Sequence, residues 1–229
     1  MPLAIITGAS RGLGLALARE LATRNWALVI DARGARDLEV VARELGQLTE
    51  VAALPGDVAD ANHRRDLLSA AGPDIDLLVN NASILGPSPQ PQLDDYPLEI
   101  VKRVYDVNVF APLALCQLVL PRLPDGGRII NITSDAAVEA YEGWGGYGSA
   151  KAALEQLTAV LAAEQPELRI YAADPGDMRT RMQQEAFPAE DISDRSLPEI
   201  SVPGMIELIE GDLPSGRYVV RQLKARERV

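Results

Sequence analysis

The chain of 229 residues has a single cysteine, Cys116, and a single histidine, His63. One thiol cannot form an internal disulfide or a metal site built from several cysteines, and no metal site is expected. Cys116 lies in the apolar stretch PLALCQLVL, which predicts a buried core thiol. A catalytic histidine needs a partner that orients its ring, and the charged stretch DANHRRDLL offers none, so His63 is expected at the surface. These counts exclude Cys–His chemistry, and they exclude a Ser–His–Asp triad unless His63 takes part.

Basic residues are outnumbered, and long apolar runs are missing. The chain has 22 lysines and arginines against 33 aspartates and glutamates, which gives a formal charge of −11. Nucleic acids and anionic membranes attract basic surfaces, so neither is expected as a partner. The N-terminal MPLAIITGAS has no basic region followed by a hydrophobic signal segment, and no run approaches about 18 apolar residues. These absences predict a cytoplasmic location.

The residues that are present indicate an ordinary globular protein. Hydrophobic residues make up 47% of the chain, and 229 residues suit a single domain. Short apolar runs rich in Val, Ile and Leu alternate with longer helical patterns. The expected strands are residues 3–7, 27–30, 50–54, 75–80, 127–133, 168–173 and 217–220. The expected helices are residues 13–23, 35–45, 61–70, 98–120, 147–163 and 203–210.

This alternation predicts an α/β fold: one Rossmann-like, doubly wound parallel sheet of about seven strands with helices on both faces, spanning residues 1–229 as a single domain. Two segments interrupt the pattern. Residues 84–95 carry three prolines and predict a structured loop, whereas residues 177–199 are polar, charged and irregular. Ligands of such sheets bind at the carboxyl ends of the strands, so residues 177–199 are expected to form a substrate loop.

A glycine cluster, TGASRGLG at residues 7–14, follows the first expected strand and leads into a helix. Its spacing is G-x-x-x-G-x-G, not the G-x-G-x-x-G usually quoted. A turn without side chains lets the backbone approach a pyrophosphate, whose charge then meets the helix N-terminus. A glycine-rich turn that binds nothing is the alternative, but the position at a strand–helix junction favours nucleotide binding.

The stretch ALVIDARGAR at residues 27–36 bears on which dinucleotide is bound. Asp31 at the end of the second strand would accept a hydrogen bond from a ribose 2′-hydroxyl and select NAD. Arg33 or Arg36 would bind a 2′-phosphate and select NADP, and Arg11 in the glycine cluster is a further cation for that phosphate. The arginines favour NADP, and Asp31 keeps NAD open as the second choice.

A second cluster, GWGGYGSAK at residues 143–151, places Tyr147 and Lys151 four residues apart. On a helix both side chains lie on one face. A phenol has a pKa of about 10, and a neighbouring ammonium is expected to lower it, which would make Tyr147 a general acid or base. The Y-x-x-x-K spacing alone also occurs by chance on many helices.

Further motifs accompany this pair along residues 3–180. They are DV at residues 57–58, NNAS at 80–83, Asn108, ITS ending at Ser134, and DPGDMRT at 174–180. In order and approximate spacing, these motifs and the two glycine clusters resemble those of the short-chain dehydrogenase/reductase family. The resemblance covers nearly the whole chain, and the motifs are jointly specific.

The resemblance implies roles for the catalytic residues. Tyr147 would exchange a proton with the substrate oxygen, and Lys151 would lower the tyrosine pKa and hold the nicotinamide ribose. Ser134 would bind the substrate carbonyl, and Asn108 would hold a water behind the lysine. The residues expected to line the dinucleotide are Gly8, Ser10, Arg11, Gly12, Leu13, Gly14, Arg33, Asp57, Val58, Asn80, Ala82, Tyr147, Lys151, Pro175, Gly176, Met178 and Thr180. Asp57 would lie near the adenine and Thr180 at the carboxamide.

Two positions depart from the family pattern. Ser83 stands where N-N-A-G has glycine, which puts the local cofactor contact in doubt. The C-terminal SGRYVVRQLKARERV is charged and lacks the glycine-rich ending that helps build a tetramer in the family. A homodimer through the helices at 98–120 and 147–163 is therefore expected alongside the homotetramer typical of the resemblance.

The sequence thus predicts an NADP-preferring oxidoreductase that interconverts a carbonyl and a secondary alcohol of a small molecule. The alternative is a non-catalytic dinucleotide-binding redox sensor or scaffold. The substrate is expected to contact residues 83–85, 135–137, Tyr141, Trp144 and 177–199. This set mixes aromatic, aliphatic and acidic groups and points to no single substrate. The carboxylates of Asp135, Glu139, Glu142 and Asp177 disfavour a strongly anionic substrate, but Arg179 and Arg181 could offset them.

Overall fold

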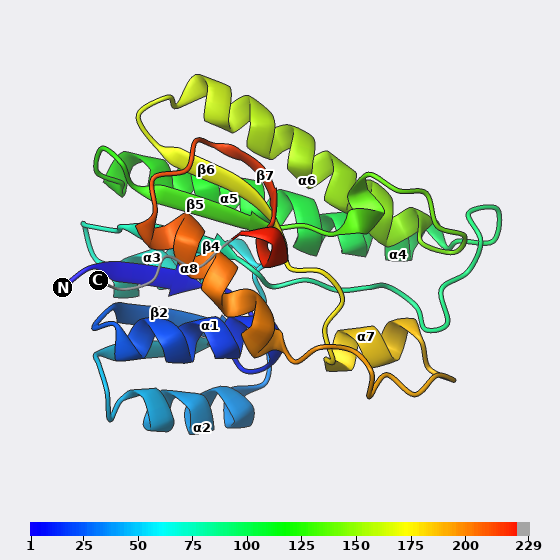
Figure 1. Ribbon diagram of the computed structural model, residues 1–229, viewed down its shortest axis with the longest axis horizontal. Helices are drawn as coiled ribbons and strands as arrows, with labels where there is room; N and C mark the ends of the chain where they lie inside the picture. Colours follow the sequence, from blue (N-terminus) through cyan, green and yellow to red (C-terminus); the bar gives the residue numbers. More distant parts are fainter. Residues whose placement is uncertain (224–229) are drawn as a thin grey trace.

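The structure, a computed structural model, describes residues 1–223. Within them, parallel strands form one seven-stranded sheet in the order β3-β2-β1-β4-β5-β6-β7. The strands are β1 (Leu3–Ile6), β2 (Ala27–Ala32), β3 (Val51–Pro55), β4 (Leu77–Asn80), β5 (Arg128–Ile132), β6 (Arg169–Asp174) and β7 (Gly216–Val219). All seven expected strands are found, and the doubly wound parallel sheet is confirmed (Figure 1).

The helices cover both faces of the sheet. They are α1 (Gly12–Thr23), α2 (Ala35–Leu45), α3 (Ala61–Ala71), α4 (Leu98–Tyr105), α5 (Ala111–Val119), α6 (Gly145–Glu164), α7 (Arg181–Ala186) and α8 (Val202–Glu210). Helices α1, α2 and α8 pack on one face, and α3, α5 and α6 pack on the other (Figure 1).

Alternation along the strands divides the core between these two faces. In β1, Ala4 and Ile6 point to the α1 side, whereas Ile5 points to the α3 side. All three side chains are fully buried. Strands that are apolar on both faces are typical of a parallel sheet covered by helices, and they explain why the strands read as continuous apolar runs. Cys116 lies in the second of these cores, as expected, and burial raises the pKa of its thiol to about 12.

Two regions differ from the sequence expectation. The helix expected at residues 98–120 is α4 and α5 joined by a π-helical turn, Asp106–Phe110. The continuous helical segment Leu98–Arg122 is long and apolar enough to cross a membrane by length and composition alone. Half of its apolar window is buried inside the fold, as in the core helix of an α/β domain. The segment 177–199 is not wholly irregular, because it contains α7.

The C-terminal part of the described chain returns to the sheet. Strand β7 pairs with β6 at the edge, and a short 3₁₀ turn, Val220–Gln222, follows it. The expectation that a charged ending replaces the family's glycine-rich one rests partly on residues 224–229, which lie outside the described residues.

Candidate active site

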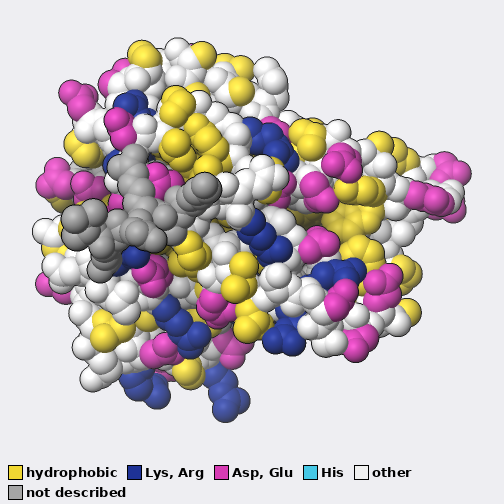
Figure 2. Space-filling view, viewed as in Figure 1, with side chains coloured by type: hydrophobic (Ala, Val, Ile, Leu, Met, Phe, Trp, Pro, Cys, Tyr) yellow, Lys and Arg dark blue, Asp and Glu magenta, His cyan; other side chains and the backbone are white. Residues whose placement is uncertain are grey.

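A pocket of about 500 Å³ lies at the carboxyl ends of the strands. It is bounded by the loops that follow strands β1 to β6. The first turns of α1 and α6, and helix α7, also line it. This is where a doubly wound sheet opens a crevice, because the loops after neighbouring strands diverge to opposite faces. Figure 2 shows hydrophobic side chains in a hollow beside the α7 segment, with acidic side chains around it.

The glycine cluster forms one wall of the pocket. Gly8 and Gly12 have φ values of 68° and 57°, a left-handed conformation that glycine adopts without strain. A Cβ on Gly8 would lie 2.9 Å from the Cα of Ala82, so the loop also packs too closely for a side chain. Helix α1 begins at Gly12, and no side chain caps its N-terminus. Its first N–H groups are therefore available to an anion such as a pyrophosphate.

Asn81 fastens this loop to the end of β4. Its Nδ2 donates to the carbonyl oxygens of Thr7 at 2.8 Å and Gly8 at 3.1 Å. Gly14 does not line the pocket but permits this contact, because a Cβ there would lie 2.5 Å from Asn81 Nδ2. Gly14 was expected to line the dinucleotide, but it packs α1 against Asn81 and the carbonyl of Gly8 instead.

Asn80, the other asparagine of NNAS, does not line the pocket either. Its Nδ2 donates to Oδ1 of Asn131 at 2.8 Å in the buried interior, next to Cys116. Successive side chains of a strand point to opposite faces, so the end of β4 directs Asn80 inward and Asn81 toward the glycine loop. The structure thus places Asn81, and not Asn80, beside the pocket.

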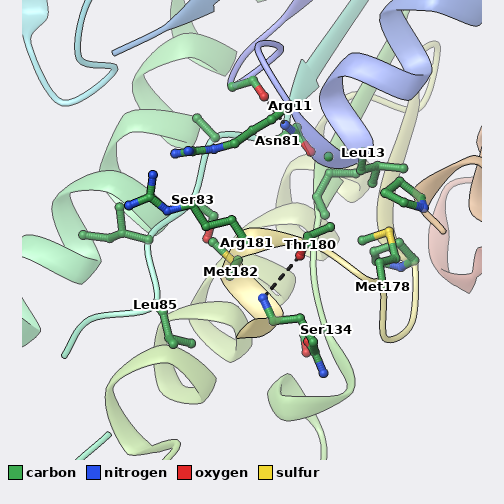
Figure 3. Close-up of a pocket in the computed structure, with 18 of the residues that line it drawn as sticks. Arg11, Leu13, Asn81, Ser83, Leu85, Ser134, Met178, Thr180, Arg181 and Met182 are labelled. Atoms are coloured by element: carbon green, nitrogen blue, oxygen red, sulfur yellow. Dashed lines mark hydrogen bonds between the residues drawn. The ribbon is translucent and has the colours of Figure 1, made fainter. Parts of the chain in front are cut away.

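The other residues expected to line the dinucleotide do surround the pocket. They are Gly8, Ser10, Arg11, Gly12, Leu13, Arg33, Asp57, Val58, Ala82, Tyr147, Lys151, Pro175, Gly176, Met178 and Thr180. Figure 3 shows Arg11, Ser83, Ser134 and Thr180 around this space. Asp57 is held by its neighbours: it accepts from the Ala59 N–H at 2.9 Å and pairs with Arg103. Although burial opposes it, these contacts and the charges of Arg103 and Arg33 lower the pKa of Asp57.

Asp31 and His63 differ from expectation. His63 is buried and not at the surface, and its Nε2 lies 3.0 Å from Oδ2 of Asp31. The other carboxylate oxygen of Asp31 accepts from the backbone N–H of Gly8 at 2.7 Å. Both oxygens of Asp31 thus have partners within the protein. The sequence around His63 gave no sign of a partner because Asp31 is 32 residues away.

The catalytic candidates meet at the start of α6. Tyr147 and Lys151 lie one turn apart and are 7% and 2% exposed. The Lys151 ammonium donates to the carbonyl of Ile132 at 2.8 Å and lies 5.5 Å from the centre of the Tyr147 ring. Burial lowers the pKa of Lys151 to about 8, against the opposing charge of Glu155. At neutral pH the lysine is therefore charged, but only just.

The expected lowering of the Tyr147 pKa is absent. Burial raises it above its ordinary value, and the carboxylates of Asp135 and Asp174 raise it further. The nearby hydroxyls of Ser83 and Ser134 oppose this rise without cancelling it. The lower pKa was predicted from the Lys151 ammonium alone. Asp135 and Asp174 are far from Tyr147 in the sequence, and only the fold brings their carboxylates near its hydroxyl. The protonated phenol is therefore the stable form of Tyr147 in this pocket.

Ser134 lies just beyond β5, at the start of a 3₁₀ turn, Asp135–Ala137. Its hydroxyl donates to Oδ1 of Asp135 at 2.7 Å and accepts from the N–H of Ala136 at 3.2 Å. Gly148 permits this turn to pack on α6, because a Cβ there would lie 2.6 Å from the Ala136 carbonyl. The serine is thus held on the same side of the pocket as the Tyr147 hydroxyl.

Asn108 is buried behind the pocket, in the π-helical turn. Its amide donates to the carbonyl of Ile84 at 2.8 Å and accepts from the Ile84 N–H at 2.9 Å. The hydroxyl of Ser83 also donates to Asn108 Oδ1, at 3.1 Å. Asn108 therefore positions residues 83–84 and does not line the pocket, and its expected role of holding a water stays a prediction.

Helix α7 covers the mouth of the pocket over Tyr147. Met182 and Ala186 pack against a small apolar cluster that contains Leu85, Ala136 and Tyr147. Trp144 joins this cluster, with ring centroids 5.7 Å from Tyr147 and 5.9 Å from Phe187. Of the expected substrate residues, 83–85, 135, 144, 177–183, 186, 198 and 199 line the pocket. Ala136, Ala137 and Tyr141 do not, and Tyr141 bonds to Asp135 and Glu139 instead.

An ion-paired network behind Ser134 was missed. Arg217 of β7 donates to Glu155 at 2.9 Å and to Asp174 at 3.0 Å, and Glu155 accepts from the Thr133 hydroxyl at 2.6 Å. Glu155 lies four residues after Lys151, so helical spacing could have placed it on the same face. Arg217 gives no local signal, because only the pairing of β7 with β6 brings it there.

The fold and the pocket define a dinucleotide-binding oxidoreductase of the doubly wound α/β class. A short chain dehydrogenase family model matches residues 2–191, and a sepiapterin reductase of Bos taurus is 32% identical over 227 residues, covering 91% of this chain and 84% of the relative. The chain belongs to the short-chain dehydrogenase/reductase family, and it is an enzyme of that family.

Solved structures agree with this assignment. An alcohol dehydrogenase of the archaeon Thermococcus sibiricus, complexed with 5-hydroxy-NADP, is 29% identical with a TM-score of 0.85 and full coverage of both chains, 100% each. A short chain dehydrogenase of Shigella flexneri, complexed with NADP, is 26% identical with a TM-score of 0.84. That match covers 94% of this chain and 95% of the other.

Proposed function

We propose that the protein is an NADPH-dependent reductase that converts a small-molecule carbonyl to a secondary alcohol, with Tyr147 as the acid. The observation that carries this proposal is the meeting of Tyr147, Lys151 and Ser134 in the pocket that the glycine loop also lines. A pocket that only sensed a dinucleotide would need the loop but not a buried phenol, ammonium and hydroxyl together.

The residues present fit a nicotinamide dinucleotide. The glycine loop meets the pocket at Gly8 and Gly12, which have no side chain, and the uncapped N-terminus of α1 suits the pyrophosphate. Asp57 would lie at the adenine, Lys151 at the nicotinamide ribose and Thr180 at the carboxamide. When bound, the reduced dinucleotide supplies the hydride to the carbonyl carbon.

The chain's own residues supply the proton and the geometry. Ser134 donates a hydrogen bond to the substrate oxygen in exchange for its bond to Asp135. As negative charge develops on that oxygen, Tyr147 transfers its phenolic proton to it. The Lys151 ammonium stabilises the phenolate that remains. Helix α7 and Trp144 limit the access of water, which strengthens each of these interactions.

The raised pKa of Tyr147 supports its proposed role as an acid. Burial and the two aspartates keep the phenol protonated, so the resting residue is an acid and not a base. An acid is what carbonyl reduction requires. Alcohol oxidation would need Tyr147 as a phenolate, and burial with the charges of Asp135 and Asp174 disfavours that form.

The preference for NADPH rests on two features of the pocket wall. Arg33 and Arg11 are exposed side chains that line it and can bind a 2′-phosphate. Asp31, which would favour NAD, has both carboxylate oxygens engaged by Gly8 and His63. The two structurally similar proteins complexed with NADP and 5-hydroxy-NADP support the same preference.

The substrate class is a carbonyl compound without strong negative charge. Asp135 and Asp177 line the pocket, and Arg179 and Arg181, which also line it, could offset part of their charge. Like charges this close would repel an anionic substrate. The similarity to a sepiapterin reductase adds sepiapterin to a test panel of neutral ketones, diketones and aldehydes.

Replacing Tyr147 with phenylalanine tests the proposed acid. Tyr147→Phe should lower kcat on any reduced carbonyl by about 10²–10⁴-fold, because the proton donor is lost. NADPH affinity, measured by isothermal titration calorimetry, should change little. Tyr141→Phe is the matched control, since Tyr141 lies outside the pocket, and it should keep most of the activity. A Tyr147→Phe enzyme with most of the wild-type rate would exclude Tyr147 as the acid, and NADPH binding without any turnover would support the redox-sensor alternative.

Replacing Arg33 tests the cofactor preference. Arg33→Ala should weaken NADPH by about 1.5–3 kcal/mol, since one charged hydrogen bond to the 2′-phosphate is lost. NADH, which lacks that phosphate, should bind nearly as before. Arg36→Ala, on an exposed arginine outside the pocket, is the control and should affect neither cofactor. Equal wild-type affinities for NADH and NADPH would contradict the preference.

A further inference from the structure

The protein buries an Asp–His pair that the proposed chemistry does not use. Asp31 ends β2 and His63 belongs to α3, and their side chains are 1% and 8% exposed. The Nε2–Oδ2 distance is 3.0 Å, a good hydrogen bond. A buried carboxylate is costly unless it is paired, so this contact has a stabilising role at the least. Its location suggests a second role.

The pair holds Asp31 against the glycine loop. Oδ1 of Asp31 accepts from the Gly8 N–H at 2.7 Å, and the Asp31 carbonyl accepts from the Ala9 N–H at 2.8 Å. With Oδ2 bonded to His63, the carboxylate is directed at the loop and at α3. Asp31 nevertheless lies in the pocket wall, next to Arg33. The orientation of one carboxylate therefore decides which charge the pocket presents there.

The ring of His63 packs closely against Gly56. A Cβ on Gly56 would lie 2.2 Å from Nδ1 of His63 and 2.5 Å from its Cε1. The imidazole thus occupies the space that a side chain at position 56 would fill. Gly56 directly precedes Asp57 in the sequence. Nδ1 faces Gly56 and Nε2 faces Asp31, and because a carboxylate only accepts, Nε2–H donates to Asp31.

We infer that His63 is a cofactor-selectivity residue that acts by positioning Asp31. By holding the carboxylate toward Gly8, His63 prevents it from facing the adenosine ribose, and Arg33 is then the charge that the 2′-position meets. A released Asp31 would accept a hydrogen bond from a ribose 2′-hydroxyl and repel a 2′-phosphate. This inference rests on the proposed NADPH preference and names the residue pair that sustains it.

The experiment measures the dissociation constants of NADPH and NADH by isothermal titration calorimetry for wild type and variants. His63→Val removes the donor and fills most of the space. It should lower the ratio of NADH to NADPH dissociation constants by about tenfold or more, mainly by weakening NADPH. His63→Gln, which keeps an N–H donor, should lower the ratio less.

Asp31→Asn separates selectivity from structure. The asparagine keeps an acceptor for the Gly8 N–H but has no charge, so it should preserve or increase the preference for NADPH. In the double variant His63→Val/Asp31→Asn, the preference should return, because no carboxylate remains to be released. If His63 only supported the fold, His63→Val would weaken both cofactors together and Asp31→Asn would not rescue it.

Each outcome bears on one claim. An unchanged ratio in both His63 variants, or a lack of rescue in the double variant, overturns the inference. If His63→Val does not fold, the ratios of NADH to NADPH dissociation constants in His63→Gln and Asp31→Asn test the inference instead. A ratio in Asp31→Asn that is lower than in the wild type overturns the inference. The wild-type ratio alone tests the proposed NADPH preference, so the two failures are distinguishable.

Discussion

At the scale of single residues, Lys151 is the group whose environment most constrains the chemistry. It is buried, its ammonium has one short bond to Ile132, and burial lowers its pKa to about 8. A lysine at the surface would stay charged to about pH 10. In the proposed mechanism, the charge that stabilises the Tyr147 phenolate is therefore held by a residue that loses it slightly above neutral pH.

The pH dependence of reduction should report this lysine. Below pH 8 Lys151 is charged, and above it the ammonium is lost, so kcat/KM for the carbonyl should fall as pH rises through about 8. The raised pKa of Tyr147 keeps the acid protonated across the same range. Steady-state rates between pH 6 and about 10, at saturating NADPH, measure the profile.

Lys151→Arg is the matched control for that profile. An arginine stays charged throughout the range, so any remaining activity should lose the fall near pH 8. A wild-type profile that is flat up to pH 9.5 would show that the Lys151 charge does not control the step.

At the scale of elements, β7 contributes to the site through Arg217, although it stands at the edge of the sheet. Arg217 joins Glu155 of α6 to Asp174 of β6, and these carboxylates are 15% and 5% exposed at their side chains. Removing one partner of such a pair leaves the other charges buried and unpaired. The edge strand thus keeps two acidic groups neutralised behind Ser134.

Arg217→Met should therefore destabilise the protein by about 2 kcal/mol, a value below that of a fully buried pair because Arg217 is 29% exposed. The measurement is the free energy of unfolding in urea. Arg169→Ala is the control on the neighbouring strand, since within residues 1–223 Arg169 forms an ion pair with the exposed Asp212 alone, and it should cost less than about 1 kcal/mol. Equal losses in both variants would contradict the role given to the Arg217 network.

Most elements of the fold could be predicted from the sequence, because their signals are local. The seven strands are short apolar runs, and α2 begins and ends at the expected residues, 35 and 45. The π-helical turn at Asp106–Phe110 could not be predicted, since its sequence DVNVF continues the helical pattern on both sides. Helix α7 was missed because it is six residues long and is held by packing on Tyr147 and Trp144 rather than by its own periodicity.

In the site as well, features with a local sequence signal could be predicted, and features set by contacts between distant residues could not. The positions of Gly8, Ser134, Tyr147 and Lys151 in the pocket were anticipated, since each belongs to a motif at the end of a strand or the start of a helix. The raised pKa of Tyr147 was not anticipated, because it arises from burial and from Asp135 and Asp174, which belong to other elements. The burial of His63 depends likewise on Asp31, a residue that only the fold brings to it.

At the scale of the whole molecule, hydrophobic side chains remain exposed on the outer helices. Leu98 and Phe110 are 73% and 56% exposed along the helical segment that runs from α4 to α5, and Val160 of α6 is 44% exposed. We propose that these apolar side chains, on helices that contact each other, lie in an interface with a second copy of the chain. We therefore expect a homodimer that uses these helices.

Phe110→Asp should shift the protein toward the monomer, because a charge in an apolar interface is left without a partner. Sedimentation velocity at several protein concentrations measures the state. Leu48→Asp, at a side chain that is 54% exposed in the turn after α2, is the control and should leave the assembly unchanged. A wild-type protein that is monomeric at all concentrations would remove the basis for the expectation.

The two tryptophans of the chain lie in very different surroundings. Trp26 is buried in the core beneath α1, whereas Trp144 lines the pocket and touches both Tyr147 and Phe187. A dihydronicotinamide bound against Lys151 would absorb the light that Trp144 emits, while Trp26 would give a steady background. The quenching of tryptophan fluorescence would therefore follow cofactor binding without any added label.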